Sequence, residues 1–176
     1  IWRTGGEVRY AITKHIASGI PISAFVFDSP WEVSYNDFTW NMTQWGAGGS
    51  YEGTFYNGFS SVTDMMTFLQ QNGVKVVCWF TPFLNTSSFN DNVNGNNIPG
   101  QNTGKSPNYD FAANNGYFVR SSVGGPPLID MWWKGTGSPI DFTNPAAVNW
   151  FKTTQLQPLV DGSKVVTANS SLEPVI

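Results

Sequence analysis

Two nearly continuous apolar runs, each preceded by a helical pattern, limit what this chain can fold into. The runs cover residues 20–27 and 74–80. A strand that is apolar on both faces is typical of a parallel sheet, and parallel neighbours need a crossover segment, usually a helix, between them. The alternation therefore predicts an α/β fold with a parallel sheet, in which ligands lie past the carboxyl ends of the strands.

Three helices have recognisable start and stop residues. Each begins at a polar side chain that can cap the first turn, and the first two end at a glycine. The start residues are Thr4, Ser61 and Asn144, and the stop residues are Gly19 and Gly73. A short last strand is expected at residues 163–167. The resulting order of helices and strands repeats the unit from which parallel sheets are built.

Two segments between these elements show no sustained hydrophobic period. Residues 32–60 are predicted to form a long loop. Residues 84–140 are predicted to form a long irregular insertion, because Asn, Gly and Pro are dense there. Structureless segments of this length are uncommon in compact domains and tend to be functional where they occur.

Composition excludes several classes of function. Only 12% of residues are charged and the formal net charge is −3, so no basic face is expected for nucleic acid. No apolar run approaches the length of a membrane span. A single cysteine, Cys78, excludes an internal disulfide and a cysteine-based zinc site, and the single histidine, His15, is expected to be structural. We expect no metal and no cofactor.

Aromatic residues are abundant, with 8 Trp, 13 Phe and 6 Tyr. Flat rings beside small polar groups suit uncharged, hydroxyl-rich ligands, although a large aromatic core explains the same composition. Asp28 directly follows the first apolar run, where its carboxylate can accept hydrogen bonds from sugar hydroxyls. Trp31 is close by in sequence as a stacking surface, whereas Asp141 is expected to cap the turn before a helix.

Five motifs give the chain a resemblance to a known family. They occur in order between about residue 5 and residue 164. Their sequences are FDSPWE (27–32), NDF (36–38), KVVCWFTPF (75–83), YFVR (117–120) and WWKG through DFTNP (132–145). Together they resemble glycoside hydrolase family 31, whose members are retaining α-glycosidases and related transglycosylases built on a (β/α)₈ barrel.

The resemblance implies a partial (β/α)₈ TIM barrel with long βα loops, comprising roughly the first four strands. The chain of 176 residues is shorter than a complete barrel, which needs roughly 200–250. Residues 1–176 are therefore expected to be one partial barrel, a fragment of a catalytic domain. Asp28 matches an aspartate that holds substrate hydroxyls, while Trp79 and Trp133 match aromatic positions lining the same subsite. With Trp31, these are the predicted substrate-binding residues.

One departure from the family pattern affects catalysis. The family places its nucleophile in a pattern like Asp-Gly-Phe-Lys-x-Asp, which here is DGSKVV and puts Val166 at the nucleophile position. No catalytic residue is therefore assigned, and the acid/base residue is expected in the other half of the barrel. The chain could be an altered fragment of a larger enzyme, a non-catalytic relative, or half of a barrel that pairs with a second chain.

The expected function is hydrolysis or transfer of α-linked glycosides, by a chain that is inactive alone. The alternative is a non-catalytic carbohydrate-binding or structural protein on the same scaffold. Expected partners are an α-glycoside and the remainder of the barrel or a second chain, but neither nucleic acid nor membrane. The family's sugar substrates favour a secreted or secretory-pathway protein, although the N-terminal residues lack the apolar region of a signal peptide.

Overall fold

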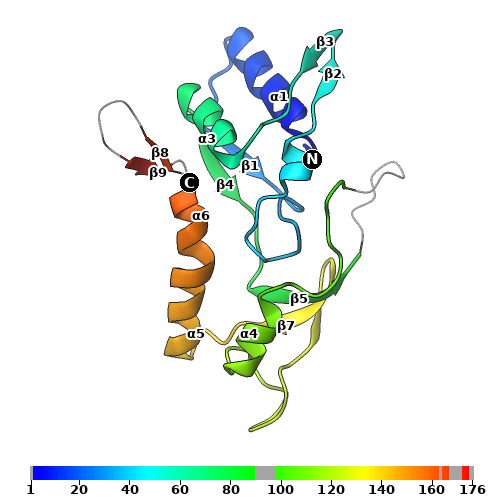
Figure 1. Ribbon diagram of the computed structural model, residues 1–176, viewed down its shortest axis with the longest axis vertical. Helices are drawn as coiled ribbons and strands as arrows, with labels where there is room; N and C mark the ends of the chain where they lie inside the picture. The colour runs from blue at the N-terminus through cyan, green and yellow to red at the C-terminus, as the bar shows by residue number, and fades with distance from the viewer. Residues whose placement is uncertain (1, 90–97, 163, 167–171, 175–176) are drawn as a thin grey trace.

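Helix–strand units and a separate antiparallel sheet make up the computed structural model, which describes residues 2–89, 98–162, 164–166 and 172–174 (Figure 1). The elements in chain order are α1 (Gly5–Ala17), β1 (Ala24–Phe27), α2 (Met42–Trp45), β2 (Gly49–Tyr51), β3 (Thr54–Tyr56), α3 (Val62–Gln71), β4 (Lys75–Cys78), β5 (Phe83–Ser88), α4 (Tyr109–Asn114), β6 (Asp130–Trp132), β7 (Gly135–Pro139), α5 (Pro145–Trp150), η1 (Phe151–Leu156, a π-helix), α6 (Gln157–Gly162), β8 (Lys164–Val166) and β9 (Leu172–Pro174).

The predicted helix starts are confirmed by their hydrogen bonds. The Thr4 hydroxyl accepts from the Glu7 N–H at 3.1 Å, and the Glu7 carboxylate accepts from the Thr4 N–H at 3.2 Å, which completes a capping box. Ser61 caps α3 and Asn144 caps α5 in the same way, through their side-chain oxygens. These bonds satisfy N–H groups that have no partner within the helix.

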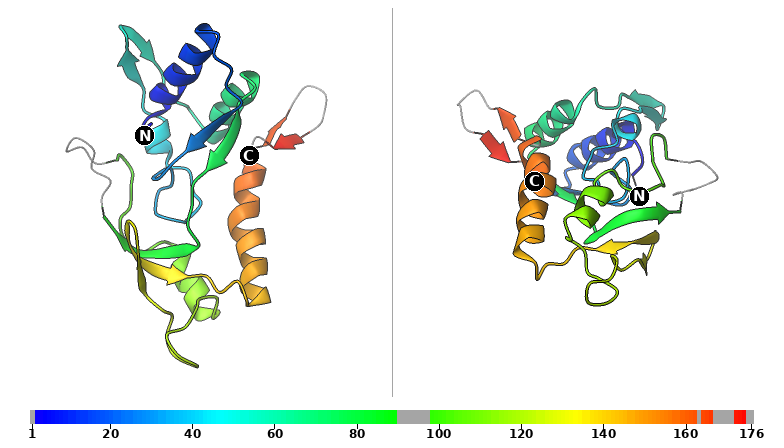
Figure 2. Two further views of the ribbon diagram at one scale, coloured as in Figure 1. Left: turned by 180° about the vertical axis from the view of Figure 1, so that it is seen from behind. Right: turned by 60° about the horizontal axis from the view of Figure 1, so that its bottom comes forward.

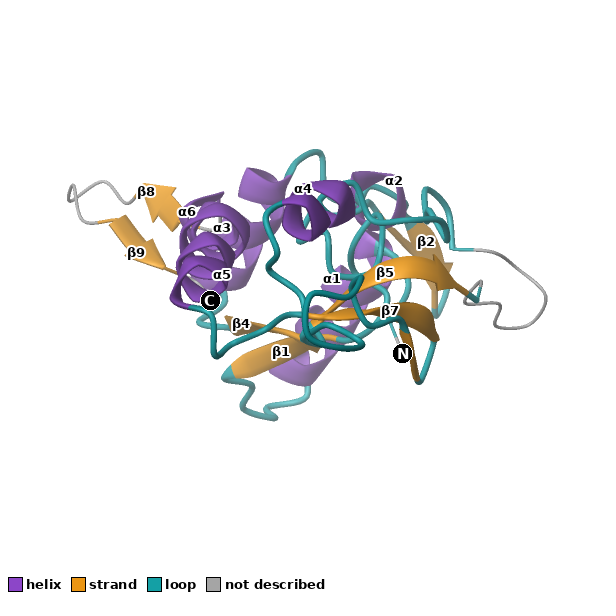
Figure 3. Cartoon of the chain, turned by 90° about the horizontal axis from the view of Figure 1, so that it is seen from below, coloured by secondary structure: helices purple, strands orange, loops and turns teal. Residues whose placement is uncertain are grey.

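Strands β1 and β4 pair in parallel, with Phe27 opposite Cys78. The expectation that both are buried on both faces is wrong, because burial alternates along each strand. Val26 and Val77 are 54% and 47% exposed, since the described sheet has two strands and helices cover only one of its faces. Figure 3 shows this pair beside the helices that pack on it.

The covered face of β1 and β4 packs against α1 and α3 in one hydrophobic core. Two phenylalanines from β1 contribute rings, and α3 contributes two methionines and a leucine with no exposed surface. This set comprises Phe25, Phe27, Met65, Met66 and Leu69, packed with Val8 and Ile12 of α1. The methionine-rich face of α3 is therefore core filling.

The segment 84–140 is not an irregular loop in the part that the structure describes. It contains α4 and most of a three-stranded antiparallel sheet in the order β5-β7-β6. The hydrophobic pattern did not predict these strands, because β7 is built largely of Gly, Ser and Thr. At Gly137 a Cβ would approach the Leu84 carbonyl oxygen to 2.5 Å, so glycine lets the two backbones pair closely. Residues 90–97 lie outside the described residues.

The segment 32–60 also contains regular structure, namely α2 and the β2–β3 hairpin. The last predicted strand appears as β8, but it pairs antiparallel with β9 and not with the parallel sheet. Residues 163 and 167 lie outside the described residues. Helices α5, η1 and α6 follow one another without a break and form one long helical run (Figure 2).

The loop after β1 is held by a buried carboxylate. Glu32 accepts hydrogen bonds from the backbone N–H groups of Asn36 at 3.0 Å and Phe38 at 3.1 Å. Both donors have positive φ angles, of 60° and 58°, a conformation that Asn tolerates and Phe adopts rarely. The Glu32 bonds thus stabilise a backbone shape that the sequence would otherwise disfavour.

Burial changes the acidity of this loop. It raises the pKa of Glu32 well above its usual range, although the N–H donors from Asn36 and Phe38 oppose this. Burial also raises the pKa of Asp37 from 3.8 to about 6, opposed by hydrogen bonds from the backbones of Thr39 and Ser34. Two carboxyl groups in this loop therefore favour the protonated state more than exposed acids do.

The first glycine of α1 gives a test of the packing. Replacing a helical glycine by alanine usually stabilises a protein, but a Cβ at Gly5 would lie 2.0 Å from the Trp45 carbonyl oxygen. We predict that Gly5→Ala lowers the free energy of unfolding by about 1–3 kcal/mol in urea titrations. Gly162→Ala in α6, where a Cβ meets nothing within 4 Å, is the control and should be neutral or stabilising. Equal effects of the two variants would contradict this packing.

The raised pKa of Asp37 gives a second test. Because the folded state holds this proton more tightly than the unfolded chain, the contribution of Asp37 to stability is present at low pH and is lost as the pH rises from about 4 through 6. Relative to Asp37→Asn, the unfolding free energy of the parent chain should fall by about 2–3 kcal/mol over this range. The stability difference between the parent chain and Asp141→Asn should instead grow as the pH rises, because hydrogen bonds from Thr143 lower the pKa of Asp141. A stability difference between the parent chain and Asp37→Asn that does not vary with pH would refute the assignment.

Candidate functional site

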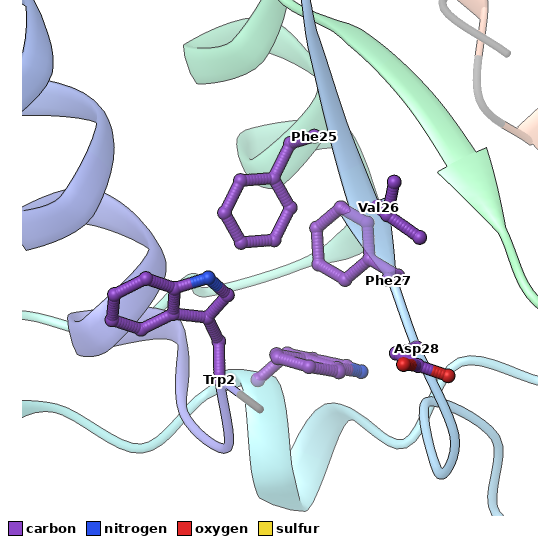
Figure 4. A pocket seen from close by; sticks show the side chains of 6 residues that line it. Trp2, Phe25, Val26, Phe27 and Asp28 are labelled. Atoms are coloured by element: carbon purple, nitrogen blue, oxygen red, sulfur yellow. The ribbon is translucent and has the colours of Figure 1, made fainter.

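Asp28 lies at the carboxyl end of β1, where its side chain is exposed. Its Oδ1 accepts from the backbone N–H of Ser29 at 2.7 Å, which leaves the other carboxylate oxygen open to solvent or a ligand. Beside it is a cavity of about 230 Å³ lined by Trp2, Phe25, Val26, Phe27 and Trp45. Figure 4 shows the Phe25 and Phe27 rings on the side of β1 that faces Trp2, with Asp28 at the end of the strand.

Trp79 directly follows β4 at the same edge of the sheet. Its backbone N–H donates to the Phe27 carbonyl at 3.0 Å, so the parallel pairing continues to the last residues of both strands. Since Phe27 lies opposite Cys78, the next residues, Asp28 and Trp79, are neighbours at the carboxyl edge. The resemblance implied that Asp28 and Trp79 share one subsite, and the structure places the two residues side by side at this edge.

Trp133 lies against Trp79, with ring centroids 5.9 Å apart and planes at 83°. The Trp133 side chain is 60% exposed, and the Lys134 ammonium lies 4.6 Å from its ring centroid. Trp133 therefore presents an open indole surface that is supported from one side. Neither Trp79 nor Trp133 lines the cavity beside Asp28, so the candidate site has two adjoining parts.

Trp31 does not match the prediction of a stacking surface. Its side chain is fully buried, and its Nε1–H donates to the Trp79 carbonyl at 2.6 Å. Its own carbonyl accepts from Nε1 of Trp45 at 2.9 Å. Because its ring has no free face, Trp31 positions the backbone of Trp79 and does not offer a surface to a ligand.

Three aromatic residues of the site were missed by sequence analysis. Trp2 and Trp45 line the cavity beside Asp28, and Tyr35 packs edge-on against Trp132 with centroids 4.7 Å apart. Trp132, the last residue of β6, is buried, whereas Trp133 lies in the turn before β7 and is open. No local sequence signal identifies Trp2 and Trp45, because they come from segments apart from Asp28 in sequence.

The loop containing Glu32 fixes the segment that follows Trp79. The buried Asn36 amide donates to the Thr81 hydroxyl at 2.9 Å and to the Phe83 carbonyl at 2.6 Å, and its oxygen accepts from the Thr81 N–H at 3.1 Å. All of its side-chain polar atoms are thereby used for structure. The Asn36 side chain thus ties the loop after β1 to the segment that follows Trp79.

Other reactive side chains have structural roles. Burial raises the pKa of Cys78 to about 12, with a smaller effect of the Glu32 charge, so its thiol is inert at neutral pH. Asp141 accepts from the N–H of Thr143 at 2.9 Å and from its hydroxyl at 2.6 Å, in the turn before Asn144 caps α5. His15 lies on α1, with Nδ1 2.8 Å from the Ala11 carbonyl.

The groups at this site are suited to binding a neutral, hydroxylated ligand. It offers one exposed carboxylate, which can accept hydrogen bonds from hydroxyl groups, and indole faces suited to the C–H surface of a sugar ring. In the part of the chain that the structure describes, no group of three or more His, Cys, Asp or Glu side chains is arranged to hold a metal ion. No helix among the same residues is long and apolar enough to cross a bilayer.

The sequence matches the TIM-barrel domain of glycosyl hydrolases family 31 over residues 2–171. It is 29% identical over 127 residues to the mouse myogenesis-regulating glycosidase, covering 71% of this chain and 13% of that protein. It is 27% identical over 142 residues to an alpha-xylosidase of Lactiplantibacillus pentosus, covering 81% and 14%. The chain spans 12–14% of the length of these and the other curated relatives it matches.

Solved structures agree on the fold. A family 31 dextranase from Flavobacterium johnsoniae, complexed with glucose, superimposes with a TM-score of 0.67 at 17% identity, covering 94% of this chain and 16% of that one. An alpha-xylosidase from a soil metagenome, complexed with xylose, superimposes with a TM-score of 0.64 at 16% identity, covering 94% and 19%. The described residues form no closed barrel, in agreement with a partial one. The chain therefore belongs to glycosyl hydrolases family 31 and corresponds to its TIM-barrel domain.

Proposed function

We propose that this chain forms the sugar-binding part of a retaining α-glycosidase site. The observation that carries the proposal is the meeting of Asp28 and Trp79 at one edge of the parallel sheet, with the open indole of Trp133 against Trp79. Asp28 accepts hydrogen bonds from ring hydroxyls, and Trp133 supports the apolar face of the sugar. The reaction is hydrolysis or transfer of an α-linked glycoside.

Xylose and glucose are the sugars that the names of the relatives indicate for this site. One relative is an alpha-xylosidase, another is the rat lysosomal alpha-glucosidase, and the two structural neighbours described above hold glucose and xylose. A pyranose carries no net charge, which agrees with a site that contains a single carboxylate.

We further propose that the chain does not complete the reaction alone. Retaining glycosidases use two carboxyl groups about 5–5.5 Å apart, one as nucleophile and one as acid/base. Position 166, where the family pattern has its nucleophile, is valine in β8. Asp28 serves substrate binding and has no second exposed carboxylate beside it in the cavity lining. The acid/base residue would belong to the other half of the barrel.

The uncovered face of the parallel sheet fits the same proposal. Val26 and Val77 lie side by side on this face and are both about half exposed, and the outer edge of β1 has no strand beside it in the described chain. Unpaired strand edges and open apolar faces favour association. The remainder of the barrel, or a second chain, would cover this surface.

A non-catalytic carbohydrate-binding protein is the second candidate, and Val166 is the observation that favours it. Such a protein would keep Asp28, Trp79 and Trp133 and have no need of a nucleophile. Both proposals predict sugar binding by this chain. The intact mass of the native protein separates them, since a mass well above 19.4 kDa supports an enzyme that contains the whole barrel.

The first prediction from this proposal concerns turnover. The purified chain, incubated with aryl α-glucoside, α-xyloside and α-galactoside, should release no aryl alcohol above a buffer blank, because it lacks the pair of carboxyl groups. A spectrophotometric assay over several hours measures this. Turnover that disappears in Asp28→Ala would overturn the assignment of Asp28 to binding alone and show that the chain is an enzyme by itself.

The second prediction concerns binding. Titration with methyl α-D-xylopyranoside or methyl α-D-glucopyranoside should change the tryptophan fluorescence, because Trp79 and Trp133 line the site. Asp28→Asn should weaken this binding roughly tenfold, since a hydrogen bond to a charged group contributes about 1.5–3 kcal/mol.

Glu52→Gln provides the matched control for this titration. Glu52 is an exposed carboxylate that pairs with Lys14 at the β2–β3 turn, away from the Asp28 cavity. Its replacement should leave the dissociation constant unchanged. Equal affinities of the Asp28→Asn, Glu52→Gln and parent proteins would remove the support for Asp28 as a sugar ligand.

A further inference from the structure

Tyr35 is a buried residue that contacts the neighbours of both parts of the candidate site. These parts are Asp28 with its cavity and the indole pair of Trp79 and Trp133. A sugar ring that binds both parts at once needs them at a fixed separation, because a ligand gains affinity from groups that are already in place. Tyr35 is 2% exposed, so any effect that it has on binding is exerted through other residues.

The hydroxyl of Tyr35 acts on Asp28 through Ser29. The Tyr35 and Ser29 hydroxyl oxygens lie 2.7 Å apart and share a hydrogen bond, and Ser29 is also only 2% exposed. The backbone N–H of Ser29 donates in turn to Oδ1 of Asp28 at 2.7 Å. Because Ser29 directly follows Asp28, a bond that holds the Ser29 side chain also restrains the peptide group that orients the carboxylate.

The ring of Tyr35 acts on the indole pair. It lies edge-on to Trp132, with centroids 4.7 Å apart and planes at 72°, and to Trp79, with centroids 6.4 Å apart and planes at 81°. Trp79 and Trp132 lie 6.5 Å from each other, so the three rings form one cluster. Trp133 follows Trp132 in the chain and packs on Trp79 at 5.9 Å. Edge-to-face contacts of this kind fix the relative orientation of the rings as well as their distance.

We propose that Tyr35 is a positioning residue, which sets the carboxylate of Asp28 at a fixed distance from the indoles of Trp79 and Trp133 so that one pyranose ring binds both. The inference rests on the proposed function and adds a residue that determines affinity without touching the ligand. The hydroxyl of Tyr35 holds the carboxylate in place through Ser29, and its ring holds the indoles.

The hydroxyl and the ring are separable by mutation, because Tyr35→Phe removes the first and keeps the second. The test measures the dissociation constant of methyl α-D-glucopyranoside by sugar-observed NMR titration, which tolerates weak binding. Tyr35→Phe should weaken binding by the parent chain roughly three- to fivefold, because the carboxylate is less firmly placed. In an Asp28→Ala background the same change should have no further effect, whereas in a Trp133→Ala background it should retain its full factor, since residues that act through one another are non-additive.

Tyr109→Phe is the matched control for a purely structural role. The Tyr109 hydroxyl also pairs with a buried serine, Ser138, at 2.7 Å, but Tyr109 lies on α4 and does not line the Asp28 cavity. Urea titrations should show that Tyr35→Phe and Tyr109→Phe both lower the free energy of unfolding. Only Tyr35→Phe should change the dissociation constant. Ser29→Ala removes the same hydrogen bond from its other end and should reproduce the effect of Tyr35→Phe on binding.

Each outcome decides between the positioning role and another explanation. Unchanged sugar affinity in Tyr35→Phe, when Asp28→Ala weakens binding, overturns the role of Tyr35 and leaves the proposed function standing. An equal loss in the Asp28→Ala background overturns it as well, because the effect would not pass through the carboxylate. Unfolding of both Tyr35→Phe and Ser29→Ala, when Tyr109→Phe stays folded, shows a structural role instead. A parent chain that binds no sugar overturns the proposed function, and the positioning role with it.

Discussion

The buried amide of Asn36 is the interaction on which the geometry of the candidate site depends. It links the loop after β1 to Thr81 and Phe83, which follow β4, through three hydrogen bonds. Its backbone has a positive φ and is held there by Glu32. The buried carboxyl group of Glu32 thus holds the backbone of Asn36 in place. The Asn36 side chain in turn fixes the loop after Trp79. Fully satisfied networks of this kind specify one arrangement, because each broken bond would leave a buried polar group unpaired.

Trp31 adds a second connection between the same two strand ends. Its Nε1–H donates to the Trp79 carbonyl, while Trp79 donates to the Phe27 carbonyl. The residues that follow β1 and β4 are therefore held together at the backbone as well as through Asn36. This explains why Trp31 is buried although it comes so soon after the strand. It fixes the backbone of Trp79, against whose ring the open indole of Trp133 packs.

Local signals in the sequence predicted the caps of α1, α3 and α5 and placed Asp28 directly after a strand, but they extended the second strand past Trp79, which follows β4 in the structure. These features depend on a few neighbouring residues or on the pairing rule for parallel strands. The antiparallel sheet was missed because β7 consists mainly of small residues whose fit to β5 depends on backbone contacts, as at Gly137. The burial of Trp31 and the approach of Trp2 to Asp28 were missed because they depend on contacts between distant segments.

Sugar binding and bond cleavage place different demands on this chain. Binding, as proposed, needs a hydroxyl acceptor and a supported aromatic face. Asp28 follows β1, and Trp79, which follows β4, supports the open ring of Trp133. Cleavage with retention needs two carboxyl groups at a set separation. In the proposed match to the family pattern, one of these positions is Val166. The proposed sugar contacts come from Asp28, Trp79 and Trp133, so the proposal does not require a carboxylate at position 166. The proposed function therefore separates recognition of the glycoside, which it assigns to this chain, from the chemistry, which it assigns to the whole barrel.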